Sequence, residues 1–304
     1  MDALKIENLH KSYGNHVVLD GLSFRIPENT IFGFLGKNGA GKTTTMKTIL
    51  GFLRRDKGTI EVFGEQVQYG QTNTNRFIGY LPDVPEFYGY MTPKEYLQLC
   101  GAITGLSNSE IIQKSDELLE LVGLNKVEKR IQGFSRGMKQ RLGIAQALMN
   151  SPKLLICDEP TSALDPIGRK EILDILRKIK STTTVVFSTH ILSDVESICD
   201  YVVVLDGGKN VLEGSIDELK KMKQMNEIII KFKTFKELNQ FKHNPMITTM
   251  SFEEEGDTLI FSGESTEENA LILLHELYAE NIVPLEYSVN EPTLENIFME
   301  VIQS

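Results

Sequence analysis

The sequence predicts an α/β protein in two parts: a large domain with a mixed sheet, an antiparallel β layer and a helical subdomain, and then a small α+β domain. Two observations predict the large domain. One apolar strand leads directly into a glycine-rich loop and a helix, and further strands and helices alternate to about residue 205. A new strand and helix pattern after residue 226 predicts the second domain, and 304 residues suffice for both.

The N-terminal residues predict a small antiparallel layer. Apolar and polar residues alternate at positions 4–7, a Tyr13-Gly14 turn follows, and short apolar runs occupy residues 17–19 and 22–26. A buried strand at residues 31–35 then runs into the glycine loop, and a helix is expected at residues 42–51. This strand, loop and helix order is the context that a phosphate-binding loop requires.

A helical subdomain is expected at about residues 91–150. The apolar spacing there is helical, and capping boxes open two segments, at Thr92 with Glu95 and at Ser107 with Glu110. Strands and helices alternate after it, which predicts a parallel sheet. The strands are expected at residues 153–157, 183–187 and 201–205, and the helices at residues 166–180 and 192–198.

A third capping box, at Ser215 with Glu218, begins a lysine-rich helix that ends near Met225 and marks a domain boundary. We therefore expect a nucleotide-binding domain at residues 1–216 and an accessory domain at residues 217–304. The order of elements in the accessory domain suits a split β-α-β, ferredoxin-like unit. Strands are expected at residues 227–232, 247–252, 258–262 and 283–288, and helices at 235–241, 266–279 and 293–302.

Composition narrows the class of partner. The net charge of -10 and the isoelectric point of about 5.2 argue against nucleic acid, whose recognition relies on a basic surface. No apolar run approaches the roughly 18 residues that cross a bilayer, and residues 1–11 lack the apolar core of a signal peptide. We expect a cytoplasmic protein whose three cysteines are reduced packing residues.

The glycine loop predicts a nucleoside triphosphate as ligand. Its glycines let backbone N–H groups curl around an anion, while Lys42 and Thr43 reach phosphate and Mg²⁺. The expected binding residues are Gly36, Lys37, Asn38, Gly39, Ala40, Gly41, Lys42, Thr43 and Thr44.

Two carboxylates follow the apolar strand at residues 154–157. Asp158 and Thr43 offer the hard oxygen ligands that Mg²⁺ prefers. Glu159 should emerge at the carboxyl end of the strand, where open α/β sheets place ligands, and there it can orient and deprotonate water. Ser135 and Gly137 stand where a helix at residues 136–150 begins, so their hydroxyl and N–H groups would point at an anion.

The chain resembles the ATP-binding cassette ATPases of membrane transporters over roughly residues 3–216. The resemblance is carried by an ordered set of segments: the glycine loop, residues 134–138, residues 154–160, residues 162–165 and His190. The resemblance implies that Glu159 is the catalytic glutamate, that His190 senses the γ-phosphate and that Tyr13 stacks on adenine. In these ATPases the signature helix of one subunit closes over ATP held by the other. A second ATPase subunit is thus implied, and a homodimer would suffice.

The chain departs from the family at two places. The family signature is Leu-Ser-Gly-Gly-Gln, whereas this chain keeps Ser135 and Gly137 but has Phe134, Arg136 and Met138. Where the family usually carries Gln after a strand like residues 77–81, this chain has Asp83, which we expect to reach Mg²⁺ or the attacking water. The aromatic residues that follow, Phe87, Tyr88 and Tyr90, either line a groove for a partner's helix or pack beneath the helical subdomain.

The resemblance implies an ATP-hydrolysing subunit that binds MgATP at a dimer interface and powers a separate integral membrane permease from the cytoplasmic face of the cell membrane. Residues 290–298 look like part of the extension on drug, antibiotic and ion exporters, which favours export. One alternative is a soluble cassette ATPase that acts on ribosomes or DNA. Such proteins usually carry two cassettes or a long coiled-coil insertion, and this acidic chain has neither. Another is a binding module regulated by a small molecule in the accessory domain.

Overall fold

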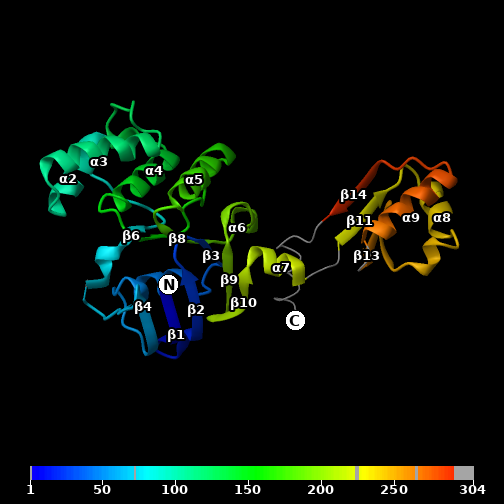
Figure 1. The fold of residues 1–304 in the computed structure, drawn as a ribbon, viewed down its shortest axis with the longest axis horizontal. Coiled ribbons are helices and arrows are strands. Elements are labelled where there is room, and N and C mark those ends of the chain that lie inside the picture. The colour runs from blue at the N-terminus through cyan, green and yellow to red at the C-terminus, as the bar shows by residue number, and fades with distance from the viewer. Residues whose placement is uncertain (1, 72, 223–225, 264–265, 291–304) are drawn as a thin grey trace. The chain divides into compact units, whose positions relative to one another are not determined.

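The computed structural model describes residues 2–71, 73–222, 226–263 and 266–290. The chain folds into two compact units, Met1–Ile216 and Asp217–Ser304 (Figure 1). Each unit has its own hydrophobic core. In the described part of the chain, no helix combines the length and the apolar character needed to span a bilayer.

A six-stranded sheet forms the centre of the first unit. Its order is β10 (Lys209–Ser215), β9 (Tyr201–Asp206), β3 (Ile31–Gly36), β8 (Thr184–Thr189), β7 (Leu154–Cys157) and β6 (Ile78–Leu81). All neighbouring pairs are parallel except β10 with β9. The parallel strands bring the ends of β3, β6, β7 and β8 to one edge of the sheet, and the predicted mixed sheet is confirmed. The edge strand β10 had no counterpart in the sequence-based expectation.

A second sheet is the antiparallel layer that the N-terminal residues predict. Its order is β2 (His16–Pro27), β1 (Asp2–Tyr13), β4 (Lys57–Val62) and β5 (Glu65–Gln66). Tyr13 pairs with His16 across the hairpin turn. The sequence did not predict β4 and β5, which join this layer from beyond the glycine loop.

Helices of the subdomain and α5 (Pro166–Ile179) cover the other face of the central sheet, whereas α1 (Lys42–Ile49) packs on the side of the antiparallel layer. The helical subdomain contains α2 (Pro93–Ile103), α3 (Asn108–Leu121) and α4 (Arg136–Ala147), and α6 (Leu192–Ile198) completes the unit. Short 3₁₀ turns occupy Asn73–Phe77 and Ile131–Gly133. The capping boxes at Thr92 and Ser107 are both formed, which explains why α2 and α3 begin where the sequence predicts.

Alternation along the buried strands divides the core of this unit into two layers. Leu154 and Ile156 of β7 belong to the cluster shared with the antiparallel sheet and α1. Leu155 and Cys157 belong to the cluster shared with helices α2 to α5. The central sheet is therefore buried on both faces, and Figure 1 shows α2 to α5 on one side of it and β1, β2 and β4 on the other.

The second unit has the predicted ferredoxin-like topology. After α7 (Ile216–Met222), it contains β11 (Asn226–Lys231), α8 (Phe235–Lys242), β12 (Phe252–Glu255), β13 (Thr258–Gly263), α9 (Thr266–Ala279) and β14 (Glu286–Asn290). The sheet order is β12-β13-β11-β14, with every neighbouring pair antiparallel. Each helix connects two strands that have another strand between them, which is the split β-α-β arrangement.

Part of this unit differs from the expectation. Residues 247–252 do not form a strand: Ile247–Thr249 is a 3₁₀ turn, and β12 begins only at Phe252. The turn is closed by a bond from the Met250 amide to the Ile247 carbonyl, 3.0 Å, and Ile247 is the buried anchor of the segment. The last strand begins at Glu286 rather than at residue 283. The expected helix at residues 293–302 and most of the 290–298 motif lie outside the described residues.

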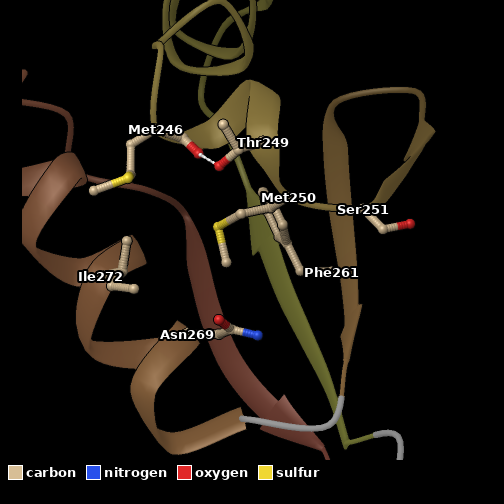
Figure 2. A pocket seen from close by; sticks show the side chains of 7 residues that line it. All are labelled: Met246, Thr249, Met250, Ser251, Phe261, Asn269 and Ile272. Carbon is tan, nitrogen blue, oxygen red and sulfur yellow. Dashed lines mark hydrogen bonds between the residues drawn. The ribbon is translucent and has the colours of Figure 1, made fainter.

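A shallow pocket of about 330 Å³ lies in the second unit between the 3₁₀ turn and α9, as Figure 2 shows. Met246, Met250 and Ile272 provide apolar lining, and Asn269 faces it from α9. The Thr249 hydroxyl donates to the Met246 carbonyl, 2.6 Å, so it is already bonded within the turn. None of the described lining residues is charged.

Candidate active site

The glycine loop lies between β3 and α1, at the edge of the central sheet where the parallel strands end. Gly39 and Gly41 have φ of 85° and 106°, a region that favours glycine. A Cβ on Gly41 would lie 2.7 Å from the Leu19 side chain, so the loop is also too close to β2 for any larger residue. The sequence folds here into an anion cradle because only glycine permits this path.

Lys42 begins α1 and is nearly buried. Its ammonium donates to the Gly36 carbonyl at 2.6 Å and to the Lys37 carbonyl at 3.3 Å. Both acceptors belong to the loop itself. The ammonium is therefore held by the loop and shielded from solvent.

A cavity of about 360 Å³ opens on this loop. Asp83 and the consecutive pair Asp158 and Glu159, which the sequence places far from Asp83 and from the loop, line it together with the loop. The loop residues that line it are Lys37, Asn38, Gly39, Gly41, Lys42, Thr43 and Thr44. Val18 also contributes, which the sequence did not indicate. Gly36 and Ala40 belong to the loop but do not line this cavity.

Glu159 joins the glycine loop to His190. One carboxylate oxygen, Oε1, lies 3.1 Å from Lys42 Nζ, and the other, Oε2, lies 3.0 Å from His190 Nδ1. Glu159 also has φ of 48°, a left-handed conformation that is strained for a residue with a side chain. Such strain is typical of functional sites, where the surrounding structure holds a residue against its local preference.

Ser188 fixes both residues that follow β7. It is fully buried at the end of β8, and its hydroxyl donates to Asp158 Oδ1 at 2.7 Å and accepts from the Glu159 amide at 2.9 Å. The sequence reasoning assigned no role to Ser188. The available signal was its position two residues before His190 and directly after the strand expected at residues 183–187.

Asp83 contacts the helical subdomain as well as the cavity. Its Oδ1 lies 3.0 Å from an Arg136 guanidinium nitrogen, and its backbone carbonyl accepts from the side-chain amide nitrogen of Gln140, Nε2, at 2.6 Å. Arg136 and Gln140 lie one turn apart on α4. Asp83 is therefore attached to α4, the helix that follows Ser135.

Ser135 and Gly137 are placed at the start of α4, as expected, but they do not line the cavity of their own chain. The Ser135 hydroxyl accepts from the Met138 amide at 3.3 Å and caps the helix. Gly137 lies near Leu164, whose side chain would be 3.8 Å from an added Cβ. Tyr13 is also outside the cavity: half of its side chain is exposed, and Lys11 Nζ lies 5.1 Å from the centre of its ring.

A buried polar network holds the chain that follows Glu159. The Thr161 hydroxyl donates to Asp194 at 2.7 Å, Arg169 pairs with the same carboxylate, and Arg169 also donates to the Ser193 hydroxyl at 2.7 Å. Asp165 caps α5 by accepting from the Gly168 amide at 3.1 Å. This network joins residues 161–169 to the segment just after His190, so Glu159 and His190 are held from both sides.

The oxygen donors suit a magnesium ion that shares its ligands with phosphate. Asp158 uses Oδ1 to accept from Ser188, and the exposed Thr43 lines the cavity. Among the described residues, no group of three or more His, Cys, Asp or Glu side chains could hold a metal by itself. Magnesium characteristically binds through one or two protein ligands together with substrate phosphates, so this donor set fits it.

Tyr80 on β6 lies close to the acidic cluster. Burial is the main cause that raises the pKa of Tyr80 to about 12, and the charges of Asp158, Cys157 and Asp83 add to it. Its phenol is consequently neutral throughout the physiological range. It supplies no negative charge to this side of the site.

A second hollow of about 400 Å³ lies between β6 and the helical subdomain, with Tyr80, Tyr88 and Ile103 in its lining. Phe87 packs against Tyr96 with ring centres 5.1 Å apart, whereas Tyr88 and Tyr90 are 54% and 63% exposed. Of the two roles that the sequence left open, packing is observed for Phe87, and the partner groove stays a prediction for Tyr88 and Tyr90. Phe87 packs into the subdomain, and the two tyrosines remain accessible.

Comparison with known proteins gives the family context of this geometry. Residues 19–162 match the family model described as ABC transporter. An uncharacterized ABC transporter ATP-binding protein of Bacillus subtilis, YxlF, is 38% identical over 99% of this chain and 100% of its own length. The bacitracin transport ATP-binding protein BcrA of Bacillus licheniformis is 35% identical over 98% of this chain and 97% of its own. The linearmycin resistance ATP-binding protein LnrL of Bacillus subtilis is 33% identical with the same coverage.

Solved structures show the same fold for the first unit. An ATP-binding subunit of an ABC transporter superposes with a TM-score of 0.65 at 31% identity, covering 72% of this chain and 92% of that chain. The cbiO1 protein of Clostridium perfringens, part of the ABC transporter complex cbiONQ, superposes with a TM-score of 0.68 at 28% identity. It covers 73% of this chain and 92% of its own.

Proposed function

Because this chain belongs to the ATP-binding subunits of ABC transporters, which hydrolyse ATP, we propose that it drives export through a separate membrane permease. The observation that carries the proposal is the convergence of Lys42, Asp158, Glu159 and His190 on one glycine loop. Full-length similarity to proteins named for bacitracin transport and linearmycin resistance supports an exporter of antibiotic-like compounds.

ATP binds with its phosphates in the loop cavity. Backbone N–H groups between Gly39 and Thr44 surround the phosphate oxygens, and the Lys42 ammonium moves from the loop carbonyls to the terminal phosphates. Tyr13 stacks on adenine from outside the cavity. Its exposed ring supports this role, since a base could cover it without displacing core residues.

Thr43 and Asp158 would hold magnesium, and Asp83 lies at the same cavity as a further carboxylate. Magnesium at this position supplies charge neutralisation for the β- and γ-phosphates. Ser188 keeps one Asp158 oxygen bonded, so the carboxylate is oriented before the nucleotide arrives. The Glu159 carboxylate orients the attacking water and accepts its proton, and His190 keeps that carboxylate oriented and contacts the γ-phosphate.

A homodimer completes the site. Ser135 and Gly137 lie at a helix start but do not line the cavity of their own chain. This placement supports a role in binding the nucleotide of a second subunit. The N–H groups at the start of α4 would contact the γ-phosphate there.

The permease docks in the hollow between β6 and the helical subdomain. Tyr88 and Ile103 supply exposed apolar surface at its rim, 54% and 74% exposed, and β6 leads directly to Asp83. A permease helix in this hollow would thus lie beside β6, which leads to Asp83 in the lining of the phosphate cavity. Through this contact the ATPase would lie on the cytoplasmic face of the cell membrane.

Affinity purification from detergent-extracted membranes of the native host tests the proposal. We expect a multi-span membrane protein to co-purify with the tagged chain in stoichiometric amount. Tyr88→Asp and Ile103→Asp should abolish this recovery and leave the ATPase rate of the isolated subunit within about twofold, since surface changes away from the site alter stability little.

Tyr69→Asp is the matched control, because Tyr69 is 60% exposed and does not line the hollow. It should co-purify the permease like the parent chain. Recovery of ribosomes or DNA-repair proteins in place of a membrane protein would refute the transporter assignment.

A further inference from the structure

The signature helix α4 is joined to the Asp83 segment along one face. Arg136, Gln140 and Gly143 are spaced by four and three residues, so they lie on the same side of the helix. Each of them meets residues 81–85. No other contact described above links the phosphate cavity to the signature helix so directly.

Two of these contacts are rigid. The fully buried Gln140 donates to the Asp83 carbonyl at 2.6 Å, and Gly143 lies so close to the segment that an added Cβ would be 2.5 Å from the Leu81 side chain. Pro82 and Pro85 also restrict the backbone of this segment. The backbone that carries Asp83 is therefore tied to α4.

The third contact is of a different kind. Arg136 and Asp83 pair at 3.0 Å, but their side chains are 41% and 48% exposed. An ion pair this exposed to water is weak, so it can be exchanged for another partner. The same Asp83 carboxylate lines the phosphate cavity.

We propose that Arg136 is a positioning residue that competes with magnesium nucleotide for the Asp83 carboxylate. With the cavity empty of nucleotide, Arg136 holds and partly neutralises this carboxylate. When magnesium nucleotide fills the cavity, the carboxylate turns toward the cation and Arg136 is released. Arg136 directly follows Ser135 in the signature loop. Nucleotide binding in the cavity of one subunit would therefore change the mobility of that subunit's signature loop, which in the proposed dimer contacts the nucleotide of the other subunit.

This inference rests on the proposed function, since it takes the cavity to hold magnesium and a nucleotide. It adds a role for a signature position at which this chain departs from the family pattern. The sign of the effect follows from charge. Removing the guanidinium leaves Asp83 with its full negative charge, which strengthens binding that depends on magnesium and weakens binding of ATP alone.

A binding cycle on the full chain tests the proposal. The probe is a fluorescent ATP analogue, and its dissociation constant is measured with Mg²⁺ and with a chelator in its place. The quantity compared is the ratio of the two constants, chelator over Mg²⁺. We expect Arg136→Gln to raise this ratio about two- to fivefold, the range that an exposed ion pair can provide.

Three variants separate positioning from a structural effect. Arg136→Lys keeps a cation and should stay near the parent ratio. Arg136→Gln in an Asp83→Asn background should leave the ratio of that background unchanged, because the partner carboxylate is gone. Lys139→Gln, a charge removal on the same helix without a described contact to Asp83, is the matched control and should also have no effect.

An unchanged ratio in Arg136→Gln, or an equal change in the Asp83→Asn background, would overturn the inference while the proposed function stands. Failure of the parent chain to bind the analogue with Mg²⁺ would overturn the proposed function and this inference with it.

Discussion

At the scale of single residues, the site depends on contacts that orient a few oxygen atoms. Glu159 is held by Lys42 on one side and His190 on the other, at 3.1 and 3.0 Å. Its amide is bonded to Ser188, so its strained backbone is fixed as well. Each predicted catalytic side chain therefore has a partner that sets its direction.

Substitutions of Glu159 and of its neighbour Lys42 should fail differently. Glu159→Gln should retain ATP binding and lose turnover by about 10²- to 10⁴-fold, because the amide cannot accept the proton of water. Lys42→Ala should lose nucleotide binding itself. Equilibrium binding and steady-state hydrolysis, measured side by side, separate the two effects. Hydrolysis at the parent rate by Glu159→Gln would show that the base lies elsewhere.

Ser188→Ala tests a residue that the sequence did not indicate. Loss of its hydroxyl removes one bond to the Asp158 carboxylate and one from the Glu159 amide. We expect activity and apparent magnesium affinity to fall about 10- to 100-fold, the effect typical of residues that orient metal ligands. A magnesium titration of the ATPase rate measures both. The control is Ser12→Ala, at the end of β1, which should behave like the parent; equal losses in both variants would contradict the assignment.

At the scale of elements, local capping interactions determine where the helices of the subdomain begin. Ser107 and Glu110 form a reciprocal box at α3, with the Ser107 amide 2.8 Å from the carboxylate. The hydrogen bonds from the Ser107 hydroxyl and amide hold the pKa of Glu110 below its usual value of 4.5. Since the folded pKa is the lower one, this stabilisation is present above pH 4.5 and is lost as the pH falls through the folded value.

Ser107→Ala should lower the free energy of unfolding at neutral pH by about 1 kcal/mol, the usual cost of losing such a cap. The deficit relative to the parent should shrink below pH 4.5, where the Glu110 carboxylate becomes protonated in both proteins. Urea unfolding at several pH values measures this. Ser107→Thr keeps a hydroxyl acceptor and should stay close to the parent. A deficit that is constant from neutral pH to pH 3 would contradict the role of the box.

At the scale of the whole molecule, each unit folds around its own core, and the nucleotide cavity lies wholly within the first unit. The signature residues Ser135 and Gly137 belong to the same unit but lie outside its cavity. The proposed dimer accounts for this placement, because it would bring Ser135 and Gly137 of one subunit to the cavity of the other.

Dimer closure is the prediction that belongs to this scale. Glu159→Gln with ATP and Mg²⁺ should shift from monomer to dimer, because bound ATP that is not hydrolysed keeps the closed state populated. Light scattering after size-exclusion chromatography measures the mass. The double variant Lys42→Ala with Glu159→Gln should remain monomeric, since it lacks the phosphate contact. A Glu159→Gln chain that stays monomeric in saturating ATP would argue against the dimer.

The sequence by itself determined the features that depend on neighbouring residues. The order of strand, glycine loop and helix, the capping boxes at Thr92 and Ser107, and the ferredoxin-like order of elements are all local patterns, and the structure confirms these elements. The local pattern failed at residues 247–252, where one buried anchor, Ile247, turns the chain before β12 begins. Local apolar character could not reveal that anchor, because burial there depends on packing against the rest of the unit.

The tertiary structure alone decided which distant residues meet. Ser188 bonds to Asp158 across 30 positions, and Arg136 pairs with Asp83 across 53. The strands β4, β5 and β10 likewise form only because partner strands lie beside them. The physical reason is that strand pairing and side-chain contacts between separate segments depend on the register of the sheet and on the packing of helices against it. Those are properties of the folded chain, which no local stretch of sequence contains.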